Sequence, residues 1–164
     1  MNYIGITSSS FVNGSGVRTV LWVAGCSHHC ENCQNQFSWN PEGGSEFTEI
    51  VEKELFGYLD RNLCDGLTLS GGDPLYLYNR PIVTRLCKRF KYRYADRKTI
   101  WLYTGYLWEN VKDLSIMQYI DVLVDGQYKD ELHNPRLEWR GSENQRVIDV
   151  KKTLASNEIV KFVK

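Results

Sequence analysis

Short apolar runs alternate along the chain with longer segments whose apolar residues recur at helical spacing. Four runs rich in β-branched and aromatic residues predict strands: 17–24, 67–69, 99–103 and 122–124. Three segments predict helices, the last of them with the weakest pattern: 47–59, 82–90 and 107–117. Parallel neighbours in a sheet need connections of about a dozen residues, which such helices provide. We therefore expect an α/β fold with a parallel sheet.

The length of the chain limits the architecture that this alternation can build. With 164 residues we expect a single domain spanning residues 1–164. A complete eight-stranded barrel takes about 250 residues, so a partial, open barrel or a short open sheet is expected instead. Ser45 is the expected N-cap of the first helix. Beyond a polar, irregular segment at 127–143, the ranges 147–150 and 159–163 could each form a short strand.

Charge and hydropathy exclude several classes of partner. Twenty basic and twenty acidic side chains cancel, so the chain lacks the basic field that attracts nucleic acid or an anionic membrane. The first residues show no signal-peptide pattern, and no segment approaches the roughly 18 apolar residues of a membrane span. We expect a soluble, cytoplasmic protein that binds neither nucleic acid nor membrane.

Three of the five cysteines lie within eight residues, directly after the first predicted strand. Cys26, Cys30 and Cys33 in this spacing favour a metal or redox site over a disulfide framework. A cubane iron–sulfur cluster ordinarily takes four cysteines, so three would leave one iron open. A structural zinc site completed by His28 or His29 is the alternative, although both histidines are more often loop residues than ligands.

The C-x3-C-x2-C spacing after a strand resembles the signature of the radical S-adenosylmethionine (SAM) superfamily. The segment Asn13–Thr19 and the turn Ser70–Pro74 resemble those of glycyl-radical activating enzymes. Three further stretches resemble the activating proteins of anaerobic ribonucleoside-triphosphate reductases: 101–106, 121–126 and 140–146. The resemblance covers nearly the whole chain. It implies a partial, open (β/α) barrel of the radical SAM type.

The same resemblance implies a cofactor site. Cys26, Cys30 and Cys33 would hold a [4Fe-4S] cluster with one open iron, to which SAM would bind. The residues expected to border SAM are Asn32, Cys33, Gln34, Gly71, Gly72 and Asp73. Many members of the superfamily carry an aromatic residue before the third cysteine, whereas this chain has Asn32, so stacking on adenine from that position is excluded.

The implied activity is reductive cleavage of SAM to a 5′-deoxyadenosyl radical, which takes a hydrogen atom from a glycine of its protein substrate. That substrate would be the large subunit of an anaerobic ribonucleoside-triphosphate reductase, and the electron would come from reduced flavodoxin or a similar donor. No catalytic acid or base is expected, because the cofactors supply the chemistry. The alternatives are another radical SAM activating or modification enzyme and, in a different class, a zinc-stabilised binding module.

Four other residues have open or structural interpretations. Cys87 falls on the apolar stripe of its predicted helix, and core positions are expected for both Cys64 and Cys87. Arg140 and Arg146 could meet a carboxylate, meet the partner enzyme or lie on a solvated face.

Overall fold

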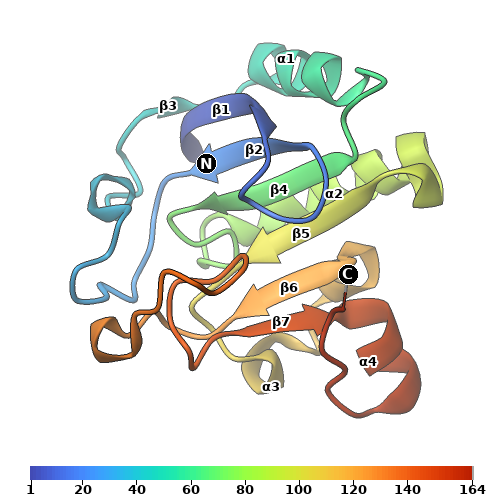
Figure 1. Ribbon diagram of the computed structural model, residues 1–164. Helices are drawn as coiled ribbons and strands as arrows, with labels where there is room; N and C mark the ends of the chain where they lie inside the picture. Colours follow the sequence, from blue (N-terminus) through green and yellow to red (C-terminus); the bar gives the residue numbers. More distant parts are fainter. Residues whose placement is uncertain (164) are drawn as a thin grey trace.

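A seven-stranded mixed sheet forms the centre of the computed structural model, which describes residues 1–163 (Figure 1). The strand order is β3-β1-β2-β4-β5-β6-β7. The strands are β1 (Asn2–Ser10), β2 (Arg18–Val23), β3 (Ser45–Glu46), β4 (Gly66–Gly71), β5 (Thr99–Tyr103), β6 (Val122–Asp125) and β7 (Arg146–Asp149).

The middle of the sheet is parallel and follows the order of the sequence. β2, β4, β5 and β6 pair side by side in parallel, as the alternation of strands and helices predicts. The α-helices are α1 (Glu49–Leu59), α2 (Arg80–Tyr94), α3 (Trp108–Val111) and α4 (Val150–Ser156). The first three lie in the connections between the parallel strands, so the loops that follow these strands gather at one edge of the sheet.

The expected partial, open (β/α) barrel is wrong. β1 pairs antiparallel with β2, β3 pairs antiparallel with β1, and β7 pairs antiparallel with β6. Antiparallel strands thus flank the four parallel strands on both sides. β3 and β7 are the two edge strands of this open sheet. β1 was not predicted from the sequence; it pairs with β2 from Ser10↔Arg18 to Tyr3↔Val23 and with β3 at Tyr3↔Ser45.

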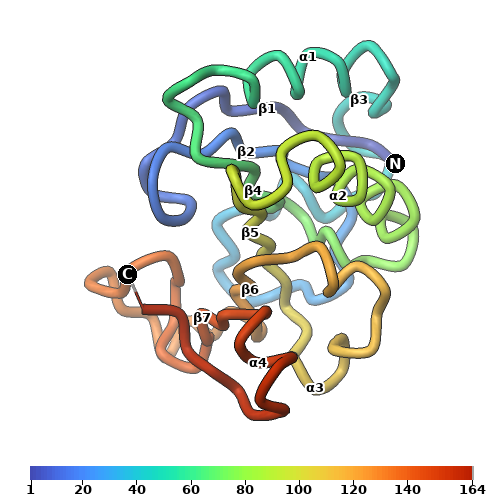
Figure 2. Tube along the Cα trace, turned by 90° about the vertical axis from the view of Figure 1, so that its right-hand side faces the viewer, coloured from blue at the N-terminus to red at the C-terminus, as the bar shows by residue number. Residues whose placement is uncertain are grey.

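The two faces of the sheet have different coverings because successive side chains of a strand point to opposite faces. Ile100 and Leu102 of β5 belong to the main core, together with apolar residues of α1 and α2. Trp101 of β5 belongs to a smaller cluster with Val122 and Val124, against which Trp139 and Phe162 pack. Figure 2 shows α2 on one side of the sheet, with the segment at 127–145 and the C-terminal end on the other.

Several predicted boundaries change in the structure. Thr48, not Ser45, caps α1, with its side-chain oxygen accepting a hydrogen bond from the Val51 N–H at 3.4 Å. The weak helix expected at 107–117 is α3 followed by a 3-10 helix, Ser115–Tyr119. The range 147–150 overlaps β7, whereas 159–163 contributes only an isolated bridge from Lys161 to Ile148. None of the described helices combines the length and apolarity required to cross a membrane.

A buried ion pair fastens β7 to β6. The Arg146 guanidinium donates to both carboxylate oxygens of the fully buried Asp125, with Nε–Oδ1 at 2.9 Å and Nη2–Oδ2 at 2.5 Å. The same guanidinium pairs with the half-exposed Glu109 at 2.8 and 3.0 Å, and its hydrogen bonds lower the pKa of Glu109 to about 2. Arg146 therefore meets carboxylates within the fold, which settles one of its open interpretations.

Removing Arg146 should destabilise the protein far more than removing its exposed partner. Arg146→Ala leaves a buried Asp125 carboxylate without its counter-ion, so we expect a loss of about 3–5 kcal/mol in the free energy of unfolding. Glu109→Gln breaks only a solvent-exposed pair and should cost at most about 1 kcal/mol. Urea denaturation of both variants measures the difference, and equal losses would contradict the assignment.

Candidate functional site

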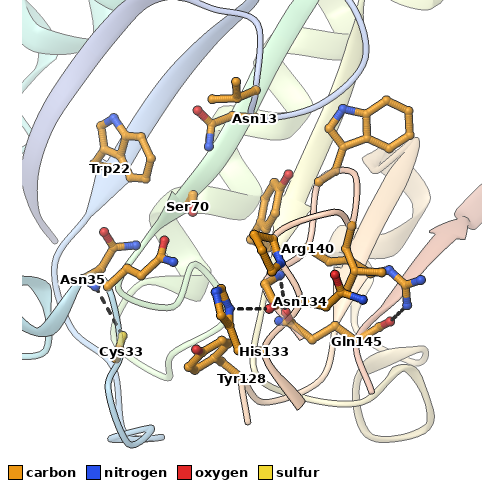
Figure 3. A pocket seen from close by; sticks show the side chains of 17 residues that line it. Asn13, Trp22, Cys33, Asn35, Ser70, Tyr128, His133, Asn134, Arg140 and Gln145 are labelled. Carbon is orange, nitrogen blue, oxygen red and sulfur yellow. Dashed lines mark hydrogen bonds between the residues drawn. The ribbon is translucent and has the colours of Figure 1, made fainter. Parts of the chain in front are cut away.

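The loop after β2 carries the three clustered cysteines. Backbone hydrogen bonds fasten its beginning, from Gly25 N–H to the Ser38 carbonyl at 2.8 Å and from Cys26 N–H to the Trp39 carbonyl at 3.0 Å. Further on, the Asn35 N–H donates to the Cys33 sulfur at 3.4 Å (Figure 3). Cys26, Cys30 and Cys33 are all free and partly exposed. The three sulfurs thus lie on one short loop at the carboxyl edge of the parallel strands, the edge at which ligands of α/β sheets commonly bind.

Burial favours the protonated form of two of these thiols. It raises the pKa of Cys26 to about 11 and also raises the pKa of Cys30. The neighbouring cysteines add to both shifts, because like charges on nearby sulfurs repel. A thiol must lose its proton to become a metal ligand, so metal binding by this loop would release protons.

The turn after β4 packs directly against the start of the cysteine loop. Gly72 N–H donates to the Val23 carbonyl and Asp73 N–H donates to the Gly25 carbonyl, both at 2.8 Å. A Cβ on Gly72 would lie 2.5 Å from the Gly25 carbonyl oxygen, and one on Gly71 would lie 2.6 Å from the Val23 carbonyl oxygen. Contact between two backbones therefore requires both glycines, whereas their contact with a ligand stays a prediction.

The side chains of Asn32 and Asp73 are engaged with protein. The backbone φ of Asn32 is +51°, in the left-handed region that asparagine tolerates, and its amide donates to Asp130 at 2.8 Å. This hydrogen bond lowers the pKa of Asp130. The Asp73 carboxylate is buried and accepts hydrogen bonds from the loop after β5. A cofactor contact by Asp73 is therefore expected from its backbone, and the Asn32 amide already uses one of its donors within the protein.

A cavity of about 480 Å³ borders the cysteine loop. Of the predicted site residues, only Cys33 and Gln34 are among its described lining residues. The others do not line it: Cys26, Cys30, Asn32, Gly71, Gly72 and Asp73. Figure 3 shows Trp22, Cys33 and Asn35 on one side of the cavity and residues of the β6–β7 connection on the other. Its volume lies in the usual range for small-molecule sites, about 300–1,000 Å³.

Three neighbouring strands supply the floor of the cavity. Trp22 of β2 is in register with Ser70 of β4, and Leu69 pairs with Leu102, which places Ser70 beside Tyr103 of β5. All three of Trp22, Ser70 and Tyr103 line the cavity. The Tyr103 hydroxyl is buried and has no hydrogen-bond partner among the described residues, and burial raises its pKa.

The far wall comes from the β6–β7 connection, where 127–143 was expected only to be polar and irregular and 140–146 carried part of the family resemblance. Side chains bonded to backbone shape it: His133 Nδ1 lies 3.0 Å from the Gly141 carbonyl oxygen, and Gln145 Oε1 accepts from the N–H groups of Gly141 and Ser142. Arg140 donates to the Gln145 carbonyl at 2.5 Å (Figure 3). Arg140 thus lines the cavity while its guanidinium supports the wall.

Comparison with known proteins identifies the family. Residues 12–148 match the model of a 4Fe-4S single cluster domain. The chain is 47% identical to the anaerobic ribonucleoside-triphosphate reductase-activating protein of Enterobacteria phage T4, over 90% of this chain and 93% of that protein. Proteins of the same name from Vibrio cholerae and Escherichia coli are 42% and 38% identical, over 88% and 90% of this chain and 96% and 97% of theirs.

The chain belongs to the family of anaerobic ribonucleoside-triphosphate reductase-activating proteins. The resemblance to activating proteins of anaerobic ribonucleoside-triphosphate reductases is therefore confirmed, as is a 4Fe-4S domain.

The donor set of this family member suits a cluster held by three cysteines. Cys64 and Cys87 lie in the apolar core, as predicted, with exposed fractions of 5% and 0%. The Nε2 atom of His28 lies 2.8 Å from the Asp73 carboxylate, so that nitrogen is already engaged. Among residues 1–163, no three Cys, His, Asp or Glu side chains are grouped to hold a single metal ion. The three thiols of the loop are therefore not committed to the core, but this structure does not gather them around one point, so their role as cluster ligands stays a prediction.

The contact between the two loops makes a testable prediction for Gly72. Gly72→Ala places a methyl group against the Gly25 backbone, so we expect destabilisation of about 1–3 kcal/mol and lower iron content after anaerobic reconstitution. Gly57→Ala is the control, because a Cβ at this position in α1 meets nothing within 4 Å and should stabilise the helix by about 0.5–1 kcal/mol. Denaturation and iron analysis measure both. Gly72→Ala with wild-type stability would contradict the packing argument.

Proposed function

We propose that this protein activates an anaerobic ribonucleotide reductase by reductively cleaving SAM at a [4Fe-4S] cluster. The observation that carries the proposal is the placement of Cys26, Cys30 and Cys33 on one loop whose last cysteine borders a cavity of about 480 Å³. The names of the relatives support the target, since each is an activating protein of anaerobic ribonucleoside-triphosphate reductase. The protein is on this proposal a radical SAM oxidoreductase that generates a glycyl radical.

The cofactors would supply the difficult chemistry. The chemistry that the bound cluster and SAM would supply is one-electron reduction of the sulfonium, which breaks a carbon–sulfur bond to give methionine and a 5′-deoxyadenosyl radical able to take a hydrogen atom from a glycine Cα of the reductase large subunit. This chain's own residues hold the groups, orient them and keep competing partners out. That division of labour agrees with a site built from thiols, amides and aromatic rings.

Three thiolates would hold the cluster and leave one iron open to SAM. Cys26, Cys30 and Cys33 are the assigned ligands, because the other two cysteines are core residues. Gln34 would border SAM from the cavity side, since it lines the same cavity as Cys33.

The turn after β4 is the second assigned contact with SAM. Gly71, Gly72 and Asp73 would meet it through their backbone, as would Asn32, because the side chains of Asn32 and Asp73 are engaged elsewhere. The backbone N–H groups of Gly72 and Asp73 already bond to the end of β2 and to Gly25. The turn is thereby held at a fixed distance from the cysteine loop.

The cavity itself has the chemistry of a site for a polar, uncharged group. Five of its lining side chains are amides: Asn13, Gln34, Asn35, Asn134 and Gln145. Amides both donate and accept hydrogen bonds, which suits the hydroxyls and ring nitrogens of a nucleoside. The buried Tyr103 hydroxyl adds a donor that has no partner among residues 1–163, and a ligand that accepts its hydrogen bond would remove the cost of leaving it unpaired.

The protein substrate and the electron donor approach the same edge of the sheet on this proposal. The cysteines are partly exposed, so reduced flavodoxin or a similar protein could come close to the cluster. The glycine of the reductase would enter through the open mouth of the cavity.

Loss of one cysteine ligand should abolish both cluster binding and SAM cleavage. Cys30→Ala removes a thiolate ligand, so we expect little iron and sulfide after anaerobic reconstitution and no 5′-deoxyadenosine from SAM under reducing conditions. Cys87→Ala is the matched control, because this cysteine is buried in the core and should affect stability alone.

Iron–sulfide content and SAM cleavage together distinguish the proposed function from the alternatives, a zinc-stabilised module and a radical SAM enzyme with another substrate. Full cleavage by Cys30→Ala would overturn it, and tight zinc binding without iron–sulfur absorbance in the wild type would favour a structural module. Cleavage of SAM without a glycyl radical signal in the reductase would point to a different substrate.

Tyr103→Phe should have opposite effects on the free and the SAM-bound protein. Loss of an unpaired buried hydroxyl should stabilise the ligand-free protein by about 1 kcal/mol, whereas loss of the hydrogen bond to SAM should weaken binding about two- to tenfold. Thermal unfolding and equilibrium binding of SAM to the reconstituted protein measure the two effects. Lower stability without SAM, or unchanged affinity, would contradict the assignment.

A further inference from the structure

His28 lies between the first two cysteines of the loop and reaches across to the turn after β4. Its Nε2 atom is 2.8 Å from Asp73 Oδ2, and the exposed fractions of the two side chains are 14% and 2%. The hydrogen bond is therefore largely shielded from water, where an interaction with a carboxylate is stronger than at the surface.

The Asp73 carboxylate connects His28 to a third loop. Thr104 Oγ1, after β5, lies 3.0 and 2.9 Å from its two oxygens, and the Gly105 N–H donates to Oδ2 at 3.0 Å. The Leu75 N–H donates to Oδ1 at 2.8 Å, which closes the turn on itself. One carboxylate thus joins the loops that follow β2, β4 and β5.

The rest of His28 is held by the loops after β5 and β6. Its ring packs edge-on against Tyr106, with centroids 4.6 Å apart, and a Cβ on Gly105 would come within 2.4 Å of the imidazole. The Gln127 side chain, after β6, donates to the His28 carbonyl at 3.0 Å. His28 is accordingly fixed by its ring, its Nε2 and its backbone.

His29, the next residue, has fewer contacts with the rest of the fold than His28. His29 is exposed, adopts a φ of +46°, and packs only its ring against Trp39, with centroids 4.8 Å apart. Two adjacent histidines of one loop therefore differ in their attachment to the rest of the fold. That difference supplies a matched pair for experiment.

We propose that His28 is a positioning residue, which holds the cysteine loop in its cluster-binding conformation through its hydrogen bond to Asp73. The inference rests on the proposed function. Ordering a flexible loop around a cluster costs conformational entropy, and contacts that order the loop beforehand reduce that cost. Through Asp73 the same bond sets the cysteine loop against the turn assigned to SAM, so cluster retention and SAM binding depend on one network.

The test compares His28→Ala, His28→Gln and His29→Ala as reconstituted proteins under anaerobic conditions. The rate at which EDTA strips iron from the cluster should rise about tenfold in His28→Ala, the effect typical of losing a supporting partner near a metal site. Glutamine can place its amide N–H near the position of Nε2, so His28→Gln should retain the cluster almost as well as the wild type. His29→Ala should match the wild type.

Spectroscopy provides a readout that fold stability alone would not change. The electron paramagnetic resonance spectrum of the reduced cluster should change on adding SAM in the wild type, His28→Gln and His29→Ala, and respond less in His28→Ala. Wild-type iron retention and spectra in His28→Ala would overturn the proposal, as would equal iron loss from the two alanine variants. If His28→Ala does not fold, His28→Gln decides: rapid iron loss from it would overturn the role of the hydrogen bond.

Measurements on the wild-type protein distinguish failure of the positioning role of His28 from failure of the proposed function. Wild-type protein that takes up no iron–sulfur cluster would defeat the proposed function itself. Wild-type protein that holds the cluster and cleaves SAM, beside His28→Ala with the same behaviour, would defeat only the positioning role.

Discussion

The hydrogen bonds received by the Asp73 carboxylate hold together the loops on which the site depends. A buried carboxylate is costly unless donors replace the water that it loses. Here the donors and close partners come from His28, Leu75, Thr104 and Gly105, so the carboxylate is satisfied only when the loops after β2, β4 and β5 are all in place. Displacing any one of them would leave a buried charge short of partners, which makes the arrangement of the three loops cooperative.

The parallel order of the central strands is what brings these loops within reach of one carboxylate. β2, β4 and β5 are direct neighbours, and their carboxyl ends meet at one edge. Strands that are consecutive in both sequence and space, joined by right-handed crossovers, place their helices on one face. The other face stays available, and there Trp22, Ser70 and Tyr103 form the floor of the cavity. The same topology thus explains both the joined loops and the position of the cavity.

Local patterns predict the central part of the fold and fail at its edges. The four parallel strands and the helices α1 and α2 follow from runs and periodicities within each segment. β1 and β3 depend instead on pairing with other strands, β1 with β2 and β3 with β1, for which the sequence of either strand holds little information. The partial barrel was an expectation from resemblance, and pairing at the two edges, which local periodicity does not encode, decided against it.

Some residues of the candidate site can be predicted from their spacing in the sequence, whereas others are placed only by tertiary contacts. Three cysteines in eight residues identify the cysteine loop without any structure, and Gly71 and Gly72 mark a turn. No local pattern predicts the conformation of the wall at 127–145, although 140–146 carries part of the resemblance, because its order comes from side chains such as Gln145 that bond to the backbone of the segment itself. Asp73 was expected at the site as a cofactor contact, yet its side chain is bonded to protein. A motif residue can therefore have protein contacts that its place in the motif does not reveal, and only the geometry shows them.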